Sequence, residues 1–98
     1  MSFQVRTSPR SKSTSKSVYN FITNKFGAKA ANEFILKAKK TIRLIAEYPY
    51  MFKASGIDEN VRIGFITKQT SLVYSVSDDT VYLLYFWDNR QEPILPQL

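Results

Sequence analysis

The sequence contains no cysteine and no histidine. The absence of cysteine excludes disulfides, thiolate metal sites and cysteine nucleophiles, and it is typical of a reducing compartment. The absence of histidine excludes Ser-His-Asp catalysis and histidine metal ligands, so acid–base chemistry would have to use Lys, Arg, Tyr, Asp or Glu. The three glycines are isolated and form no phosphate-binding loop. We therefore expect neither a tightly bound metal nor a cofactor.

Long apolar runs are missing as well. None approaches the roughly 18 residues of a membrane-spanning helix, and the first residues, MSFQVRTSPRSK, lack the apolar segment of a signal peptide. We expect a soluble cytoplasmic protein with no membrane partner. With 98 residues and 11.3 kDa, the chain has the size of one small domain, so residues 1–98 are expected to fold around one core.

Positive charge is in excess and unevenly distributed. Fourteen Lys and Arg against eight Asp and Glu give a net charge of +6 and a pI near 9.7. Residues 1–53 hold eleven basic and two acidic residues, whereas 54–98 hold three basic and six acidic ones. A basic half on a small domain indicates an anionic partner, either a nucleic acid or an acidic protein segment, although a basic pI also serves solubility alone.

The first part of the chain predicts a short strand followed by a helix. Phe3 and Val5 alternate with polar residues, and Ser8 and Pro9 suit the N-cap and first turn of a helix. The polar stretch at 10–17 is interpreted as the solvated first turns of that helix. An apolar stripe at helical spacing follows, formed by Val18, Phe21, Ile22 and Phe26.

A second helix is predicted from Ala28 to about Tyr48, between the break at Gly27 and the stop at Pro49. The short link makes the two helices an antiparallel hairpin. The apolar face of the second helix is formed by Ala31, Phe34, Ile35, Ala38, Ile42 and Ile45.

After a loop at 48–60, the apolar period changes from 3.6 to 2. Segments 61–67, 71–77 and 80–87 are rich in β-branched and aromatic residues and are predicted as strands. Links of two or three residues join antiparallel neighbours, so these strands form a meander, with 80–87 in a central position. The expected fold class is α+β, in the order β-α-α-β-β-β, with the helical hairpin packed on an antiparallel sheet.

Charged and polar residues follow the last predicted strand directly, in the order Asp88, Asn89, Arg90, Gln91, Glu92. A guanidinium fixed at a strand end is suited to binding phosphate or carboxylate. An ion pair of Arg90 with Asp88 or Glu92 is an equally good interpretation.

Two further sets of strand residues have alternative interpretations. Arg62 is either a phosphate contact or a strand residue that points to water. Tyr74, Tyr82 and Tyr85 are expected on the sheet surface, where cross-strand packing is more common than stacking on bases.

The order of several short motifs along the chain is informative. A strand ends in S-P, a helix closes on Y-N-F-I-T-N-K-F-G, and the second helix carries A-x-x-F and then I-x-x-I-A-E-Y-P. The strands V-R-I and L-V-Y-S-V follow, and the last strand continues into W-D-N-R-Q-E-P. Over residues 3–94 this pattern resembles the RelE/ParE superfamily of type II toxin–antitoxin (plasmid stabilisation) toxins. The resemblance implies a cognate acidic, partly disordered antitoxin that wraps the basic domain in a hetero-oligomer and often represses the shared operon.

That superfamily contains two toxic mechanisms. RelE-like members cut mRNA in the ribosome by 2′-OH attack, and ParE-like members inhibit DNA gyrase. Arg90 matches the arginine that the family places after the last strand, and Arg62 falls in the basic strand before L-V-Y. Together with Lys68, these are the catalytic candidates if the protein is a metal-independent endoribonuclease.

Two positions depart from the ribonuclease pattern. Ser71 stands where RelE-like ribonucleases carry an arginine, and Ile94, Leu95 and Pro96 occupy a tail that often holds a tyrosine there. The long second helix and its A-E-Y-P end resemble ParE-like members more, so gyrase inhibition is the favoured hypothesis. Ribosome-dependent mRNA cleavage is the alternative, and a degenerate, non-toxic protein that only binds its antitoxin is the third.

The antitoxin is expected to bind at the helical hairpin. The basic half of the chain requires counter-charge, and the aromatic residues offer apolar anchorage. The expected contacts are Lys37, Lys40 and Arg43, with Phe21 near the groove.

Overall fold

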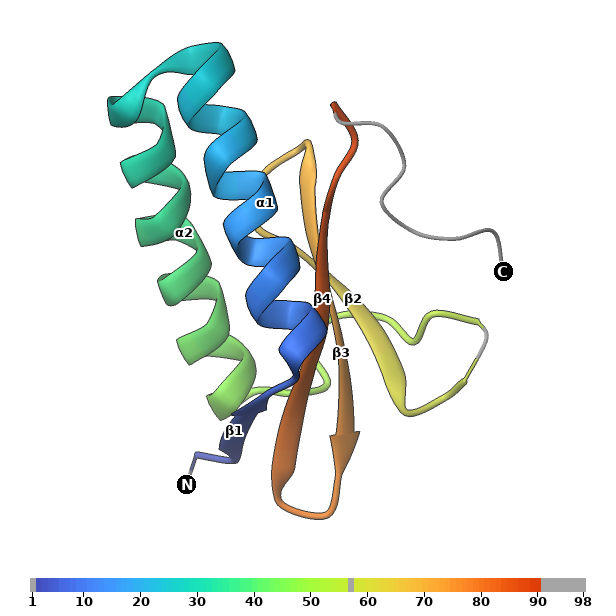
Figure 1. Cartoon of the computed structure of the whole chain (residues 1–98). Coiled ribbons are helices and arrows are strands. Elements are labelled where there is room, and N and C mark those ends of the chain that lie inside the picture. The colour runs from blue at the N-terminus through green and yellow to red at the C-terminus, as the bar shows by residue number, and fades with distance from the viewer. Residues whose placement is uncertain (1, 57, 91–98) are drawn as a thin grey trace.

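The computed structural model describes residues 2–56 and 58–90. In chain order these form β1 (Gln4–Thr7), α1 (Pro9–Phe26), α2 (Ala28–Glu47), β2 (Val61–Phe65), β3 (Thr70–Ser77) and β4 (Thr80–Asp88). The two helices form a hairpin on one face of the sheet (Figure 1). The predicted order of elements and their layering are confirmed, with small differences at the strand ends.

The four strands form a sheet in the order β1-β4-β3-β2. The meander β2-β3-β4 is antiparallel as predicted, but β1 pairs in parallel with β4, with Val5 opposite Val81. The sheet is therefore mixed rather than purely antiparallel. Because β1 covers the second edge of β4, this strand has neighbours on both sides, in agreement with its predicted central position.

Local signals in the sequence fix both ends of the helical hairpin. The Ser8 hydroxyl caps α1 by accepting the Ser11 N–H at 2.9 Å, and Pro9 stands in the first turn. Gly27 links the helices with a φ of 95°, a left-handed conformation that favours glycine. Neither α1 nor α2, the helices of the described residues, is long and apolar enough to cross a membrane.

The core fills the space between the hairpin and the sheet. Tyr74 lies inside it, fully buried, and its hydroxyl donates to the Pro49 carbonyl oxygen at 2.7 Å. The prediction that Tyr74 lies on the sheet surface is therefore wrong, whereas Tyr82 is exposed as expected. The principal core residues are Val18, Ile22, Ala31, Phe34, Ala38, Ile45, Leu72, Val76, Val81, Leu83 and Phe86.

A β-bulge interrupts β4 at Leu84. Tyr74 is paired with Leu83 and Val73 with Tyr85, so Leu84 has no partner on β3. Because side chains alternate between the two faces of a strand, the extra residue reverses the alternation. Leu83 and Phe86 thus both enter the core, although they are three residues apart.

Hydroxyl groups of α1 bind the backbone of the bulge. The Ser8 hydroxyl donates to the Leu84 carbonyl oxygen, and the Phe86 N–H donates to the Thr14 hydroxyl, both at 2.8 Å. Thr14 is only 9% exposed and Ser11 is fully buried, so the polar stretch at 10–17 is not solvated throughout as predicted. The Thr14 hydroxyl accepts a backbone N–H of β4, and the Ser11 hydroxyl donates to the Ser8 carbonyl oxygen at the start of the helix.

The bulge yields a stability prediction. Thr14→Val keeps the shape of the side chain but leaves the Phe86 N–H buried without an acceptor, which should cost about 1–3 kcal/mol. For a domain of this size, each kcal/mol lowers the melting temperature by roughly 4–8 °C. Thr23→Val is the matched control, because the Thr23 hydroxyl donates to the Tyr19 carbonyl of the same helix without reaching the sheet. Equal melting temperatures for the two variants would contradict this role of Thr14.

Candidate functional site

A buried carboxylate lies at the end of β4. Asp88 follows Phe86 by two residues, so the bulge also turns its side chain toward the helices, where it is fully buried. Thr70 is its partner on β3, and the Thr70 hydroxyl donates to Asp88 Oδ2.

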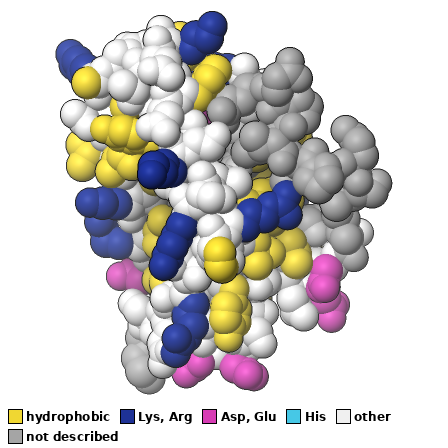
Figure 2. Space-filling view, viewed as in Figure 1, with side chains coloured by type: hydrophobic (Ala, Val, Ile, Leu, Met, Phe, Trp, Pro, Cys, Tyr) yellow, Lys and Arg dark blue, Asp and Glu magenta, His cyan; other side chains and the backbone are white. Residues whose placement is uncertain are grey.

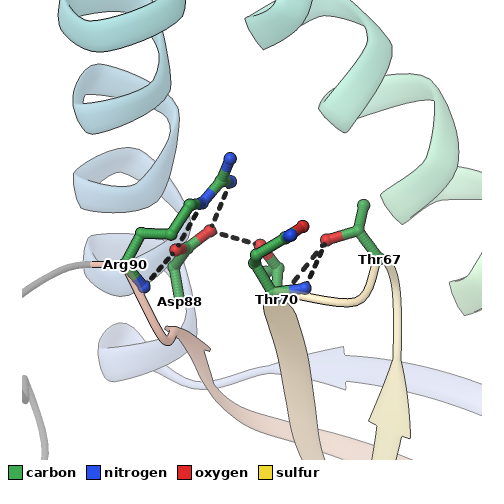
Figure 3. A network of polar contacts seen from close by, with 5 residues as sticks. Thr67, Thr70, Asp88 and Arg90 are labelled. Carbon is green, nitrogen blue, oxygen red and sulfur yellow. Dashed lines mark hydrogen bonds and ion pairs between the residues drawn. The ribbon is translucent and has the colours of Figure 1, made fainter.

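Arg90 binds this carboxylate through both its side chain and its backbone. Nε donates to Oδ1 at 3.0 Å, Nη2 donates to Oδ2 at 2.8 Å, and the Arg90 N–H donates to Oδ1 at 2.8 Å (Figure 3). With the Thr70 hydroxyl, the carboxylate accepts four hydrogen bonds. Of the interpretations offered by the sequence, the structure has the ion pair with Asp88; Glu92 and Gln91 lie outside the described residues.

The electrostatics of the pair follow from this geometry. Burial alone would raise the pKa of the Asp88 carboxyl, but the hydrogen bonds from Arg90 and Thr70, with the attraction of the guanidinium, hold that pKa below its ordinary value. The hydrogen bonds to Asp88 raise the pKa of Arg90 in turn, against the opposing effect of its partial burial. Both groups are therefore charged at neutral pH.

Two aromatic rings of α1 lie against the Arg90 guanidinium. Its central carbon is 4.9 Å from the centroid of the Phe26 ring and 5.9 Å from that of Phe21, within the range of cation–π contact. The two rings meet edge to face. Phe26 is 54% exposed, so it covers Arg90 instead of filling the core as its place in the apolar stripe predicts.

A shallow cleft of about 310 Å³ opens beside Arg90. It lies where the turn of the helical hairpin approaches the turn between β2 and β3. Lys37 and Arg90 bring two positive charges to it and Glu33 one negative charge. The other lining residues are Ile22, Phe26, Ala30, Phe34, Thr67, Gln69 and Thr70.

The turn that carries Lys68 is held against the end of β4. The Thr67 hydroxyl accepts the N–H groups of Gln69 and Thr70, and the Asn89 N–H donates to the Gln69 carbonyl at 2.7 Å. Lys68 is exposed between two residues that line the cleft. The structure thus brings Lys68 to the same end of the sheet as Arg90.

Arg62 is elsewhere. It pairs with Tyr74 in the sheet register, whereas Asp88 pairs with Thr70, which lies four residues before Tyr74 in β3. Its Nη1 donates to the Phe52 carbonyl, and its guanidinium lies 4.9 Å from the centroid of the Tyr50 ring. Arg62 therefore neither points to water nor joins Arg90, but contacts the loop between α2 and β2.

The residues predicted to bind the antitoxin occupy two places on the helical hairpin. Lys37 lines the cleft beside Arg90, and the Phe21 ring lies against the Arg90 guanidinium. Lys40 and Arg43 line a separate depression of about 330 Å³ further along α2. In Figure 2, Lys and Arg side chains are spread over the side formed by the helices, with hydrophobic side chains between them.

The sequence pattern does not identify Thr70 and Phe26 as site residues, because it places Thr70 in a turn and Phe26 in the core. The one indication that Phe26 lies outside the core is its position just before Gly27, which ends the helix. Of the positions that depart from the ribonuclease pattern, Ser71 is buried in β3, and residues 94–96 lie outside the described part of the chain. Within residues 2–56 and 58–90, no three carboxylates gather closely enough to hold a metal ion.

The pair makes stability depend on pH. A carboxyl with a lowered folded-state pKa stabilises the protein above its unfolded pKa of about 4, and this contribution is lost as the pH falls through the folded-state value. Asp88→Asn should lower the free energy of unfolding by about 1.5–3 kcal/mol at pH 7. Its difference from the wild type should shrink in acid, when urea unfolding is followed at pH 7 and pH 2.5.

Asp78→Asn serves as the control, because it removes the same charge from an exposed turn. A deficit of Asp88→Asn that stays constant between the two pH values would show that its charge is not what stabilises the fold.

Comparison with known proteins identifies the fold. No model of a protein family matches the sequence, and no curated protein matches it either. Several solved structures do match. The chromosomal ParDE toxin–antitoxin system from P. aeruginosa aligns with a TM-score of 0.73 at 9% identity, over 88% of this chain and 95% of that chain.

Two further matches come from different bacteria. The YoeB/ParE toxin from Agrobacterium tumefaciens gives a TM-score of 0.62 at 15% identity, over 87% of this chain and 96% of that one. The E. coli DinJ-YafQ toxin–antitoxin complex gives 0.64 at 10% identity, over 92% and 96%. Identities this low establish the architecture alone. The fold expected from the sequence motifs is thereby confirmed, and the chain has the RelE/ParE-like toxin fold.

Proposed function

We propose that this protein is the toxin of a type II toxin–antitoxin pair and that an acidic antitoxin segment covers its helical hairpin. The proposal is supported by the shared fold, since two of the matching structures are a ParDE system and a DinJ-YafQ complex. It is also supported by the net charge of +9 on residues 1–53, which include both helices.

The cleft beside Arg90 supplies the chemistry for such a partner. Lys37 and Arg90 attract carboxylates, and the exposed Phe26 ring offers apolar area to a neighbouring side chain. Lys40 and Arg43 extend the positive surface along α2. An acidic segment with interspersed apolar residues therefore fits both places at once.

Charge reversal tests this partner. Lys37→Glu should weaken binding of the acidic product of the neighbouring gene by about 10-fold or more at low salt, because it places like charges together. The effect should decrease as salt rises. Lys39→Glu is the matched control, since this exposed lysine lies on another side of α2. Equal affinity of the two variants in titration calorimetry would reject the cleft as the binding place.

For the target, we propose ParE-like inhibition of DNA gyrase. The carrying observation is that the three candidate catalytic cations do not form a catalytic group. Arg90 is already bound to Asp88, Arg62 contacts a different part of the fold, and Lys68 lies in an exposed turn near the cleft.

The acid–base properties of the site agree with that proposal. Cleavage of RNA through the 2′-OH requires a base whose pKa lies near neutrality. The pKa of Asp88 is lowered and that of Arg90 is raised, so both shifts move away from neutrality. Binding to gyrase requires no such group. The nearness of Lys68 to Arg90 is what favours mRNA cleavage as the second candidate.

Arg90→Ala separates the candidate targets. We expect the purified protein to slow gyrase supercoiling, to leave ribosome-bound mRNA intact, and to lose about 10-fold in gyrase inhibition on Arg90→Ala without unfolding. Arg6→Ala, at an exposed position on β1, is the control for loss of an arginine.

Codon-positioned mRNA cleavage that is abolished by Arg90→Ala would replace gyrase by the ribosome as the target. Absence of both activities in a protein that still binds its antitoxin would identify a degenerate, non-toxic member.

A further inference from the structure

Arg90 is held by more contacts than an exposed ion pair requires. Asp88 is fully buried, and it accepts three of its four hydrogen bonds from Arg90, two from the guanidinium and one from the backbone N–H. The fourth comes from the Thr70 hydroxyl on the neighbouring strand. The carboxylate is thus fixed to the sheet on one side and fixes the arginine on the other.

The contacts also determine which part of Arg90 is available. Nε and Nη2 are bound to Asp88, whereas Nη1 has no hydrogen-bond partner among the described residues. The guanidinium faces the carboxylate through Nε and Nη2, and its third nitrogen points away from Asp88 (Figure 3). Arg90 lines the cleft, with 32% of its side chain exposed. The Phe26 ring limits its movement on one face. One edge of a rigidly held cation is therefore presented to whatever enters the cleft.

We propose that Asp88 and Thr70 are positioning residues, which hold Arg90 so that its Nη1 edge meets a carboxylate or phosphate of the bound partner. This inference rests on the proposed function, in which Arg90 contacts the target. A long side chain that is fixed before binding loses less rotational freedom in the complex, so positioning increases affinity.

The first test observes Arg90 directly, whatever the target is. In ¹⁵N NMR spectra, the Nε–H of a fixed arginine should be resolved from those of mobile arginines. We expect this signal in the wild type and in Thr70→Ser, which keeps the hydroxyl. It should move toward the mobile group in Thr70→Val and in Asp88→Asn. Thr80→Val is the control, because it removes a hydroxyl at the other end of β4. An unchanged signal in Asp88→Asn and Thr70→Val, with the fold intact, overturns the proposal.

The second test uses gyrase inhibition to measure whether the effects of changing Asp88 or Thr70 depend on Arg90. Asp88→Asn and Thr70→Val should raise the concentration for half-inhibition by about 3- to 10-fold, the value of one ordered side chain, and Thr70→Ser should restore it. In an Arg90→Ala background neither change should have a further effect, because each acts through Arg90. A structural effect would instead add to that of Arg90→Ala, and additivity would overturn the inference.

The two tests separate this inference from the proposed function. A wild type that fails to inhibit gyrase removes the proposed target, and the NMR signal still decides whether Asp88 and Thr70 hold Arg90. If gyrase inhibition depends on Arg90 but not on Asp88 or Thr70, the proposed function stands and the proposal that Asp88 and Thr70 position Arg90 is rejected.

Discussion

The hydrogen bonds between the start of α1 and the bulge of β4 are the constraint on which the rest of the structure depends. The pairing of β1 with β4 ends at Leu83, so one edge of β4 has no neighbouring strand beyond that residue, and buried polar groups without partners are costly. Ser8 and Thr14 supply those partners at Leu84 and Phe86. The cap that starts α1 and the groups that satisfy β4 therefore belong to the same short segment, and this segment determines how the hairpin lies on the sheet.

The bulge also determines the chemistry of the sheet end. With regular alternation, the face that holds Leu83 would next receive Tyr85 and Trp87, and Asp88 would face away from the helices. The extra residue places Phe86 and Asp88 on the helical face instead. A carboxylate buried there needs a cation, and Arg90, two residues later, supplies it within hydrogen-bonding distance. The position of the basic cleft thus follows from one irregularity in a strand.

The parts of the fold that were predictable from the sequence are those set by local signals. Ser8, Pro9, Gly27 and Pro49 mark the helix ends, and the change of period after residue 60 marks the meander. The parallel pairing of β1 could not be predicted, because it joins segments far apart in the chain. The bulge could not be predicted either, because Leu84 is one of several consecutive apolar residues and nothing in the sequence distinguishes it from them. For the same reason the burial of Ser11 and Thr14 and the exposure of Phe26 could not be inferred from periodicity alone.

The hydrogen bond between Ser8 and Leu84 joins residues that are 76 positions apart in the chain. The hydroxyl groups at the start of α1 therefore also matter for folding. During synthesis, α1 and its hairpin partner can form from local interactions, whereas the surface that binds β4 must wait until that strand exists. An apolar surface would stay exposed throughout this interval and would favour aggregation. The hydroxyls of Ser8 and Thr14 can bind water before β4 arrives. The side chains that bind β4 in the folded protein therefore add little apolar surface to the unfinished chain.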